Sequence, residues 1–341
     1  MKAVIMAGGE GTRLKAVTGA LPKPLVPLLG RPLMEHILLL LRRNGFDEVC
    51  AALRYRSCEI RSAFGDGKRL GLRIEYRVED RPLGTAGGVR NCADFYGDED
   101  FLVISGDAAC DFDLAALMRR HRESGAAATI ALSRQAAPLR FGLAVTDGEG
   151  RVRSFVEKPA WPRVVTDLVN TGVYVLSPRA MALVPPGRPF DFARELFPLL
   201  IERGELLLGL PMEGYWCDVG TPLSYYQCCV DALEGRLRLD VPESFQTQSG
   251  AEEAAEEEEA AVTLECGCRS RAALMGALSE LMLELGADYS DGIRLKRENF
   301  SLHIAPLAES SALRIAVQAQ DTEFARRLAL SARDLARALE K

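Results

Sequence analysis

Two segments near the N-terminus carry residue types suited to binding a polyphosphate. Gly8-Gly9-Glu10-Gly11-Thr12-Arg13-Leu14 follows the short apolar run Ala3 to Ala7, and Pro22-Lys23-Pro24 comes soon after it. A glycine-rich turn after a buried strand presents backbone N–H groups to phosphate oxygens with no Cβ in the way. An arginine can hold two of those oxygens with its planar fork, and a lysine can add a point charge. The sequence therefore predicts a phosphate-binding loop built from Gly8, Gly9, Gly11, Thr12, Arg13 and Lys23.

Two better-known phosphate-binding motifs do not fit this loop. Its spacing is not that of Gly-x-x-x-x-Gly-Lys-Ser/Thr, and Leu14 stands where a dinucleotide-binding turn needs its third glycine. The loop is therefore interpreted as a different kind of phosphate site.

Two aspartates occupy positions from which a carboxylate could reach a ligand. Asp107 comes just after the apolar run Phe101 to Ile104, and Asp218 stands beside a glycine turn in Trp216-Cys217-Asp218-Val219-Gly220. Residues just beyond a buried strand face the crevice where α/β sheets bind ligands, and Mg²⁺ prefers carboxylate oxygens. Taken singly, each aspartate also fits a turn or a helix cap.

The glycine loop and Pro22-Lys23-Pro24-Leu25-Val26-Pro27 together closely resemble the signature of sugar-phosphate nucleotidyltransferases. The resemblance continues in the family's order to about Tyr226. It implies that Arg13, Lys23 and Asp107 are catalytic and that Asp107 and Asp218 bind Mg²⁺. Glu79 and Pro82-Leu83-Gly84-Thr85-Ala86-Gly87 match the family's base-binding loop, which implies nucleotide contacts from Glu79, Gly84 and Thr85.

The same resemblance places the sugar phosphate. It implies that Glu157 binds a sugar hydroxyl, that Lys158 contacts the sugar phosphate and that Gly142 belongs to the turn approaching the sugar. A Glu-Lys dipeptide is otherwise an ordinary exposed ion pair. Asn170 and Thr171 lie inside an apolar strand, where a buried polar side chain needs a partner, and a sugar hydroxyl could be one.

The segment Leu25-Val26-Pro27 looks most like that of mannose-1-phosphate guanylyltransferases. The expected reaction is therefore GTP plus mannose 1-phosphate giving GDP-mannose and pyrophosphate. Gly87-Gly88 stands where relatives often carry a bulkier residue, which leaves the nucleobase open. The alternative is a uridylyl- or thymidylyltransferase acting on glucose 1-phosphate or an amino-sugar 1-phosphate. A catalytically silent subunit that senses a nucleotide-sugar is the hypothesis from another class.

Alternating strand and helix patterns must position these residues. Short apolar runs predict strands at 3–7, 48–53, 101–105, 127–132, 151–156 and 169–176, and helical spacing predicts helices at 33–44, 114–123 and 192–203. Such alternation predicts an α/β fold with a Rossmann-like, mostly parallel sheet and helices on both faces.

A break in composition divides the chain. Six of the eight residues from Glu252 to Glu259 are glutamate, which is typical of a solvated linker. We therefore expect a nucleotidyltransferase domain at 1–241, an acidic linker at 242–262 and a small α/β domain at 263–341. The small domain is predicted to contain helices at 271–285 and 322–339 and strands at 292–296, 300–305 and 313–318.

This C-terminal segment resembles the last domain of phosphohexomutases. Where that domain grips phosphate with Arg, Ser, Gly and Thr, this chain has Ala305-Pro306-Leu307-Ala308-Glu309-Ser310-Ser311. We therefore expect a role in folding, docking or oligomerisation, either with another copy or with a partner, and not a second active centre.

Composition excludes several other classes of protein. The 341 residues carry a net charge of −6, which argues against a general nucleic-acid binder. No apolar run approaches a membrane span, and the N-terminal apolar run is too short for a signal peptide, so a cytoplasmic protein is expected. The nine cysteines are an odd number and mostly sit in apolar runs, which predicts buried thiols.

Overall fold

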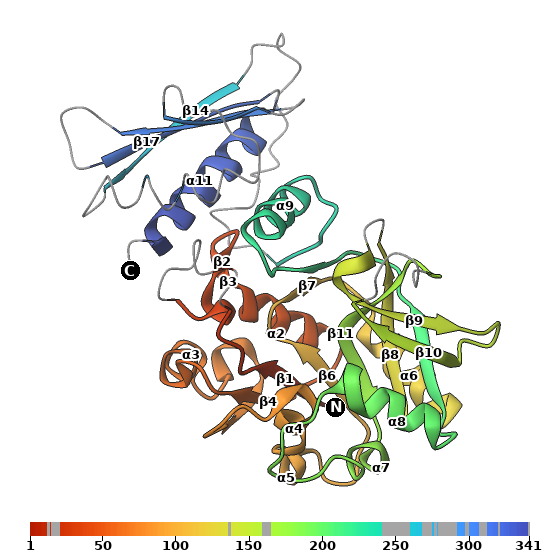
Figure 1. Ribbon diagram of the computed structural model, residues 1–341. Coiled ribbons are helices and arrows are strands. Elements are labelled where there is room, and N and C mark those ends of the chain that lie inside the picture. Colours follow the sequence, from red (N-terminus) through yellow and green to blue (C-terminus); the bar gives the residue numbers. More distant parts are fainter. Residues whose placement is uncertain are drawn as a thin grey trace. The chain divides into compact units, whose positions relative to one another are not determined.

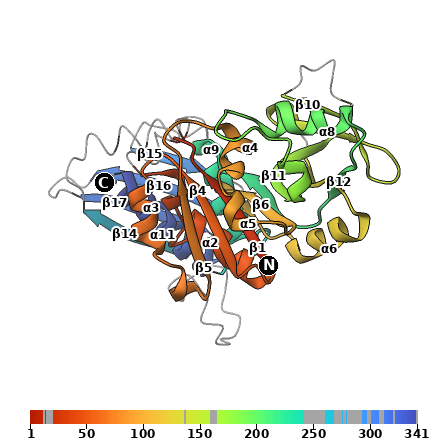
Figure 2. The same cartoon turned by 90° about the horizontal axis from the view of Figure 1, so that it is seen from below.

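A computed structural model describes residues 1–11, 14, 21–135, 138–158, 165–240, 260–267, 275, 278, 292–296, 300–306, 312–319 and 321–339. The chain clusters into two compact units. The first unit comprises Met1–Glu10 and Ile37–Asp218, and the second comprises Gly11–His36 and Val219–Lys341. Figures 1 and 2 show the elements of both.

A mixed sheet organises the first unit. Among the described residues it has nine strands, with the order β10-β9-β11-β6-β1-β4-β5 and with β8 joining β11 to β12. A separate two-stranded ladder pairs β7 with β13. The strands are β1 (Lys2–Ala7), β4 (Glu48–Leu53), β5 (Arg73–Val78), β6 (Phe101–Ser105), β7 (Ala108–Cys110), β8 (Ala128–Arg134), β9 (Gly142–Thr146), β10 (Val152–Glu157), β11 (Leu168–Leu176), β12 (Leu207–Pro211) and β13 (Trp216–Asp218).

Helices connect these strands. α2 (Leu33–Arg43) begins in the second unit and ends in the first. The others in the first unit are α3 (Ser57–Phe64), η3 (Lys68–Leu70), α4 (Gly84–Arg90), α5 (Ala93–Tyr96), α6 (Leu114–Ser124), η4 (Pro138–Arg140), α7 (Pro178–Met181), the π-helix η6 (Phe192–Leu196) and α8 (Phe197–Glu202).

The half of the sheet made by β6, β1, β4 and β5 is parallel throughout, as the sequence predicts. The six strands expected from apolar runs are all present, with ends shifted by a few residues at most. The reversed direction of β11, which pairs antiparallel to β6, β8 and β9, is a feature that strand–helix alternation does not reveal. The α/β fold class is confirmed.

Consecutive residues along β1, β4 and β6 are buried, so the side chains on both faces of these strands are covered. Val4 of β1 and Cys50 of β4 belong to a buried cluster that also takes in side chains of α4, α5, α7, η6 and α8. Figure 1 shows α4, α5 and α7 gathered on this side of the sheet. On α6, the buried residues Leu114 and Leu117 face inward, and the amide of Ala115 donates to Asn44 Oδ1 just after α2 (3.2 Å). Both faces of the sheet are thus covered, as expected for parallel strands.

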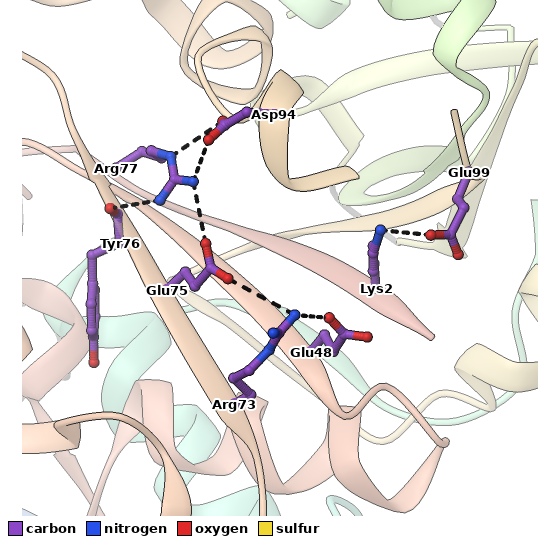
Figure 3. A network of polar contacts seen from close by, with 8 residues as sticks. All are labelled: Lys2, Glu48, Arg73, Glu75, Tyr76, Arg77, Asp94 and Glu99. Carbon is purple, nitrogen blue, oxygen red and sulfur yellow. Dashed lines mark hydrogen bonds and ion pairs between the residues drawn. The ribbon is translucent and has the colours of Figure 1, made fainter. Parts of the chain in front are cut away.

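The edge strand β5 carries charges in place of apolar residues on one side. Arg73, Glu75 and Arg77 alternate along it and extend an ion-pair network to Glu48 and Asp94 (Figure 3). Charged side chains on an edge strand discourage pairing with other chains. Because charged residues alternate along it, β5 lacks the apolar run from which the other strands are predicted.

The second unit contains two groups of elements. The first group is η2 (Lys23–Leu25), the short hairpin of β2 (Pro27–Leu28) and β3 (Arg31–Pro32), and α9 (Pro222–Leu233). Tyr225 of α9 donates its hydroxyl proton to the Pro27 carbonyl at 2.6 Å. Thr221 caps α9 with a capping box that involves Ser224.

The second group is an antiparallel sheet in the order β14-β17-β16-β15, with α11 packed on β14 and β17 (Figure 1). Its elements are β14 (Ala260–Gly267), β15 (Ile293–Lys296), β16 (Phe300–Pro306), β17 (Ala312–Ala319) and α11 (Thr322–Leu339). The predicted strands and the final helix of the tail are confirmed, whereas the helix expected at 271–285 falls almost entirely outside the described residues. The predicted domain limits stay a prediction.

None of the described cysteines forms a disulfide, and most are buried. Two described cysteines depart from the prediction of buried thiols, because Cys58 of α3 is exposed and Cys217 is half-buried. Within the described residues, no helix combines the length and apolar character that crossing a membrane requires.

Candidate functional site

A cavity of about 360 Å³ opens where β1, β4 and β6 end. These are the carboxyl ends of parallel strands, the edge at which α/β sheets bind ligands. All of its lining belongs to the first unit: Met6, Gly8, Gly9, Ala52, Arg54, Glu79, Pro82, Gly84, Thr85, Gly88, Val89, Ser105, Asp107 and Asp191.

The glycine turn after β1 forms one wall of this cavity. An added Cβ at Gly8 would lie 3.6 Å from Arg54 Cβ, while one at Gly9 would meet nothing within 4 Å. Arg54 follows β4 and pairs with Glu10 at 3.0 Å. Arg54 is not among the residues predicted from the sequence, although a cation directly after a buried strand of the same sheet is a signal that could identify it. Gly8, Gly9 and Arg54 together give this wall its N–H groups and a positive charge.

The rest of the predicted phosphate loop is only partly described. Thr12 and Arg13 lie outside the described residues. Gly11 has a positive φ of 61°, and an added Cβ there would lie 3.4 Å from Lys23 Cβ. Lys23 is buried and begins η2. The structure therefore brings Gly11 and Lys23 together in the second unit, and the roles predicted for Thr12 and Arg13 stay predictions.

Glu79 follows β5 directly and lines the cavity. Its Oε2 accepts a hydrogen bond from the Leu83 amide at 3.2 Å. Its Oε1 lies over Gly88, where an added Cβ would overlap it. Burial raises the pKa of Glu79, and the Leu83 amide and Arg54 oppose that shift. The glycine at position 88 thus leaves room for a carboxylate that faces the cavity.

The turn at Gly84 and Thr85 begins α4 and is held in place by Phe190 and Asp191, which are distant in the sequence. Gly84 has φ +72°, and an added Cβ would lie 2.6 Å from the Phe190 carbonyl oxygen. That carbonyl accepts hydrogen bonds from the amides of Ala86 (2.9 Å) and Gly87 (3.0 Å). Thr85 donates its hydroxyl proton to Asp191 Oδ2 at 2.8 Å. Asp191 is a second site residue not predicted from the sequence, because no local motif surrounds it.

The two predicted metal ligands lie at the same end of the β7–β13 ladder. Asp107 follows β6 and directly precedes β7, and its Oδ1 accepts a hydrogen bond from the Ser105 hydroxyl. Asp218 ends β13 and pairs in register with Ala108, the residue after Asp107. Among the described residues, no group of three or more His, Cys, Asp or Glu side chains surrounds a metal position. Mg²⁺ takes one or two carboxylates from the protein and completes its shell with phosphate and water, so these two residues carry the donor type that Mg²⁺ prefers.

Residues predicted to contact the sugar line up across three strands. Glu157 of β10 pairs with Gly142 of β9, and the neighbouring Leu143 pairs with Val169 of β11. Continuing that antiparallel register by one residue places Asn170 opposite Gly142. On the other side of β11, Gly172 lies beside Ser105, with an added Cβ 3.1 Å from Ser105 Cβ. The register therefore runs from Glu157 through Gly142 and Asn170 to the end of β6, where Asp107 lies.

Two residues aligned by this register, Glu157 and Asn170, have polar, half-buried side chains. Burial raises the pKa of Glu157, Asp191 raises it further, and Lys158 and Arg194 oppose the shift. Burial likewise raises the pKa of Tyr174, and the Asn170 side chain opposes that shift.

The structure adds one observation on each of two predicted sugar contacts: the backbone conformation of Lys158 and the hydrogen bonds of Thr171. Lys158 follows β10 with a positive φ of 44°, which is uncommon for a residue with a side chain. Thr171 is buried and donates its hydroxyl proton to the Ala131 carbonyl at 2.7 Å, while its own carbonyl accepts from Trp216 Nε1 at 2.9 Å. Thr171 therefore already has an internal hydrogen-bond partner, which supplies a structural reason for a polar residue in this strand.

Comparison with known proteins gives a consistent set of matches. Residues 2–235 match the family model described as "Nucleotidyl transferase". A UTP–glucose-1-phosphate uridylyltransferase of Synechocystis is 36% identical over 254 residues, covering 71% of this chain and 64% of the relative. A mannose-1-phosphate guanylyltransferase of Mycobacterium tuberculosis is 38% identical over 234 residues, covering 68% of this chain and 65% of the relative. The chain thus spans a little under two thirds of each of these relatives.

Solved structures match about two thirds of the chain. A putative glucose-1-phosphate thymidylyltransferase from Bacillus anthracis, in complex with sucrose, superposes with a TM-score of 0.63 at 26% identity. That match covers 68% of this chain and 95% of the other. HddC from Yersinia pseudotuberculosis complexed with GMP-PN gives a TM-score of 0.58 at 28% identity, over 67% of this chain and 97% of the other.

Proposed function

The chain belongs to the nucleotidyl transferase family, and we propose that it joins a nucleoside triphosphate to a hexose 1-phosphate to give a nucleotide-sugar and pyrophosphate. The observation that carries this proposal is the position of Asp107. It lines the cavity that holds Gly8, Gly9, Glu79 and Thr85, and it lies at the end of the strand register that leads to Glu157. A carboxylate there would stand between a bound nucleotide and a bound sugar phosphate.

In the proposed reaction, a phosphate oxygen of the sugar 1-phosphate attacks the α-phosphorus of the triphosphate in line. One P–O bond forms, the bond to the β-phosphate oxygen breaks, and pyrophosphate leaves with that electron pair. Gly8, Gly9, Arg13 and Lys23 would hold the triphosphate, and Lys158 would align the attacking phosphate. Catalysis of this kind depends chiefly on positioning and on neutralising charge. Mg²⁺ held by Asp107 and Asp218 would supply positive charge at the α-phosphate when bound.

GTP and mannose 1-phosphate are the proposed substrates. An ionised carboxylate such as Glu79 only accepts hydrogen bonds, and guanine presents two adjacent donors, N1–H and the N2 amino group. Uracil and thymine present a single N3–H between two acceptors. The Mycobacterium tuberculosis relative, named as a mannose-1-phosphate guanylyltransferase, supports the same choice. The Synechocystis relative, named as a uridylyltransferase, keeps UTP with glucose 1-phosphate as the second candidate.

For the C-terminal sheet and α11 we propose a remnant of a phosphohexomutase domain that serves in docking or oligomerisation. The support is the sequence resemblance together with an antiparallel sheet covered by one helix. Titration of the purified chain by analytical ultracentrifugation should show self-association that a chain ending at residue 241 lacks. Identical sedimentation of both chains would contradict a role in oligomerisation.

A matrix of GTP, UTP, dTTP and ATP against mannose, glucose and N-acetylglucosamine 1-phosphates, with Mg²⁺, tests the proposed function. Pyrophosphate release should be fastest with GTP and mannose 1-phosphate. Fastest release with UTP and glucose 1-phosphate would establish the alternative. No release in any combination, accompanied by binding of a nucleotide-sugar, would instead identify a sensing subunit.

A further inference from the structure

Asp191 joins the nucleotide-facing turn to a short π-helix. Its Oδ1 accepts hydrogen bonds from the amides of Ala193 (2.9 Å) and Arg194 (3.0 Å), which caps η6. Its Oδ2 accepts the hydroxyl proton of Thr85 at 2.8 Å. The Thr85 oxygen in turn accepts the amide of Phe192 at 3.0 Å. Both Thr85 and Asp191 line the cavity.

These contacts fix the direction of the Thr85 hydroxyl. An ionised carboxylate cannot donate, so the single hydroxyl proton must point to Asp191. One lone pair of the Thr85 oxygen is used by the Phe192 amide, which leaves one lone pair for a ligand. Towards the cavity, Thr85 can therefore only accept a hydrogen bond.

The same restriction applies to other side chains of the cavity. Ser105 directs its hydroxyl proton to Asp107, so it too can only accept from a ligand. Glu79 is an acceptor when ionised, and Arg54 is a donor that already pairs with Glu10. Arg54 and the glycine turn supply donors suited to phosphate, whereas the side chains of Thr85, Ser105 and ionised Glu79 offer acceptors. Acceptors placed around a nucleobase favour an edge rich in donors and disfavour one that presents carbonyl oxygens.

We propose that Asp191 is a positioning residue that holds the Thr85 hydroxyl as an acceptor and thereby favours guanine over uracil in the nucleotide pocket. This inference rests on the proposed function. Asp191 acts through Thr85, a residue 106 positions away in the sequence.

Asp191→Asn reverses the polarity with little change in shape. Asparagine caps helices about as well as aspartate, so its carbonyl oxygen should remain on the Ala193 and Arg194 amides. The amide nitrogen then faces Thr85 and donates to it. Because the Thr85 hydroxyl no longer has an acceptor at position 191, its proton becomes available to the cavity, where a uracil carbonyl can accept it.

The test is a double-mutant cycle of Asp191→Asn and Thr85→Val, read as the ratio of kcat/KM for GTP to kcat/KM for UTP with one sugar phosphate. Asp191→Asn alone should lower this ratio by about tenfold, the size of one hydrogen bond. In the Thr85→Val background the same substitution should change the ratio by less than about twofold, because the hydroxyl is gone. Thr85→Ser, which keeps the hydroxyl, should retain the wild-type ratio.

Three outcomes would overturn the proposal: an equal loss for both nucleotides in Asp191→Asn, an equal change of the ratio in both backgrounds, or a wild-type preference for UTP. If the wild-type protein releases no pyrophosphate with any pair, the proposed function fails. The double-mutant cycle is then measured with the dissociation constants of GTP and UTP from calorimetry. These constants test the role of Asp191 without requiring turnover. Thermal unfolding of each variant checks that the fold persists.

Discussion

Gly142 and Glu157 face each other across the β9–β10 ladder, and the missing side chain of the glycine leaves the space that the glutamate occupies. An added Cβ at Gly142 would lie 2.6 Å from Glu157 Oε2 and 2.7 Å from Phe155 Cζ. The backbone of Gly142 is not in the left-handed region, so the requirement for glycine comes from this close approach and not from the turn.

Gly142→Ala should therefore displace the Glu157 carboxylate and raise the KM for the sugar phosphate by about tenfold or more, since a misplaced hydrogen bond costs on the order of 1–3 kcal/mol. The KM for the nucleotide should change little. Steady-state kinetics with each substrate varied in turn measures both values. Gly148→Ala is the matched control, because an added Cβ there meets nothing within 4 Å. Equal behaviour of the two variants would contradict the role of Gly142.

Asp107→Asn should reduce pyrophosphate release by at least about a hundredfold, because the amide cannot supply the negative charge that Mg²⁺ requires. Circular dichroism and thermal unfolding should remain close to those of the wild-type protein. Asp113→Asn serves as control, since Asp113 caps α6 through the Ala116 amide and asparagine preserves such a cap. Near-normal turnover in Asp107→Asn would remove Asp107 from the proposed mechanism.

Glu79→Gln should change the pH dependence of stability. Burial raises the pKa of Glu79 in the folded chain above its value in the unfolded chain. Glu79 therefore contributes its full stabilisation when pH is below the unfolded pKa. This stabilisation is lost as pH rises through the folded pKa. Glutamine does not titrate. The melting temperature of the variant relative to wild type should therefore increase between pH 4 and pH 7, as measured by differential scanning calorimetry.

Glu99→Gln provides a control of opposite sign. Lys2 lowers the pKa of Glu99, so that residue contributes stability above its unfolded pKa and loses it as pH falls (Figure 3). This variant should lose melting temperature relative to wild type between pH 4 and pH 7. The same trend in both variants would show that burial does not control the ionisation of Glu79.

Thr171→Val should lower the free energy of unfolding by about 1–3 kcal/mol, because it leaves the buried Ala131 carbonyl without its hydroxyl donor. Urea unfolding measures this change. If the hydroxyl serves the fold, the KM for the sugar phosphate should stay within about twofold of wild type. A large rise in that KM with unchanged stability would support the sugar contact predicted from sequence.

Some elements could be predicted from the sequence because burial leaves a local pattern. The runs at β1 and β6 are apolar because both faces of those strands are covered, and Gly8 and Asp107 follow them directly. Strand β5 could not be predicted in this way, since Arg73, Glu75 and Arg77 place charges on the edge of the sheet. Strand β5 is polar because it lies at the edge of the sheet. The order of strands in the sheet cannot be predicted from the spacing of residues along the chain.

The site was harder to predict where it depends on pairing between distant strands. The alignment of Glu157, Gly142 and Asn170 follows from the register of β10, β9 and β11, which the sequence does not specify. Asp191 and Thr85 form a hydrogen bond because the segment before η6 packs against the start of α4. No sequence motif around either residue predicts this contact. Family resemblance supplied Glu157 and Thr85, whereas Asp191 required the structure.

The most direct test of the central claim is the stoichiometry of the reaction with GTP, mannose 1-phosphate and Mg²⁺. Mass spectrometry of the nucleotide-sugar and an enzymatic assay of pyrophosphate, run on the same samples, give both amounts. The proposed function predicts one GDP-mannose for each pyrophosphate released by the wild-type protein, and neither product from Asp107→Asn. Pyrophosphate without nucleotide-sugar, or equal product from both proteins, would contradict nucleotidyl transfer at this site.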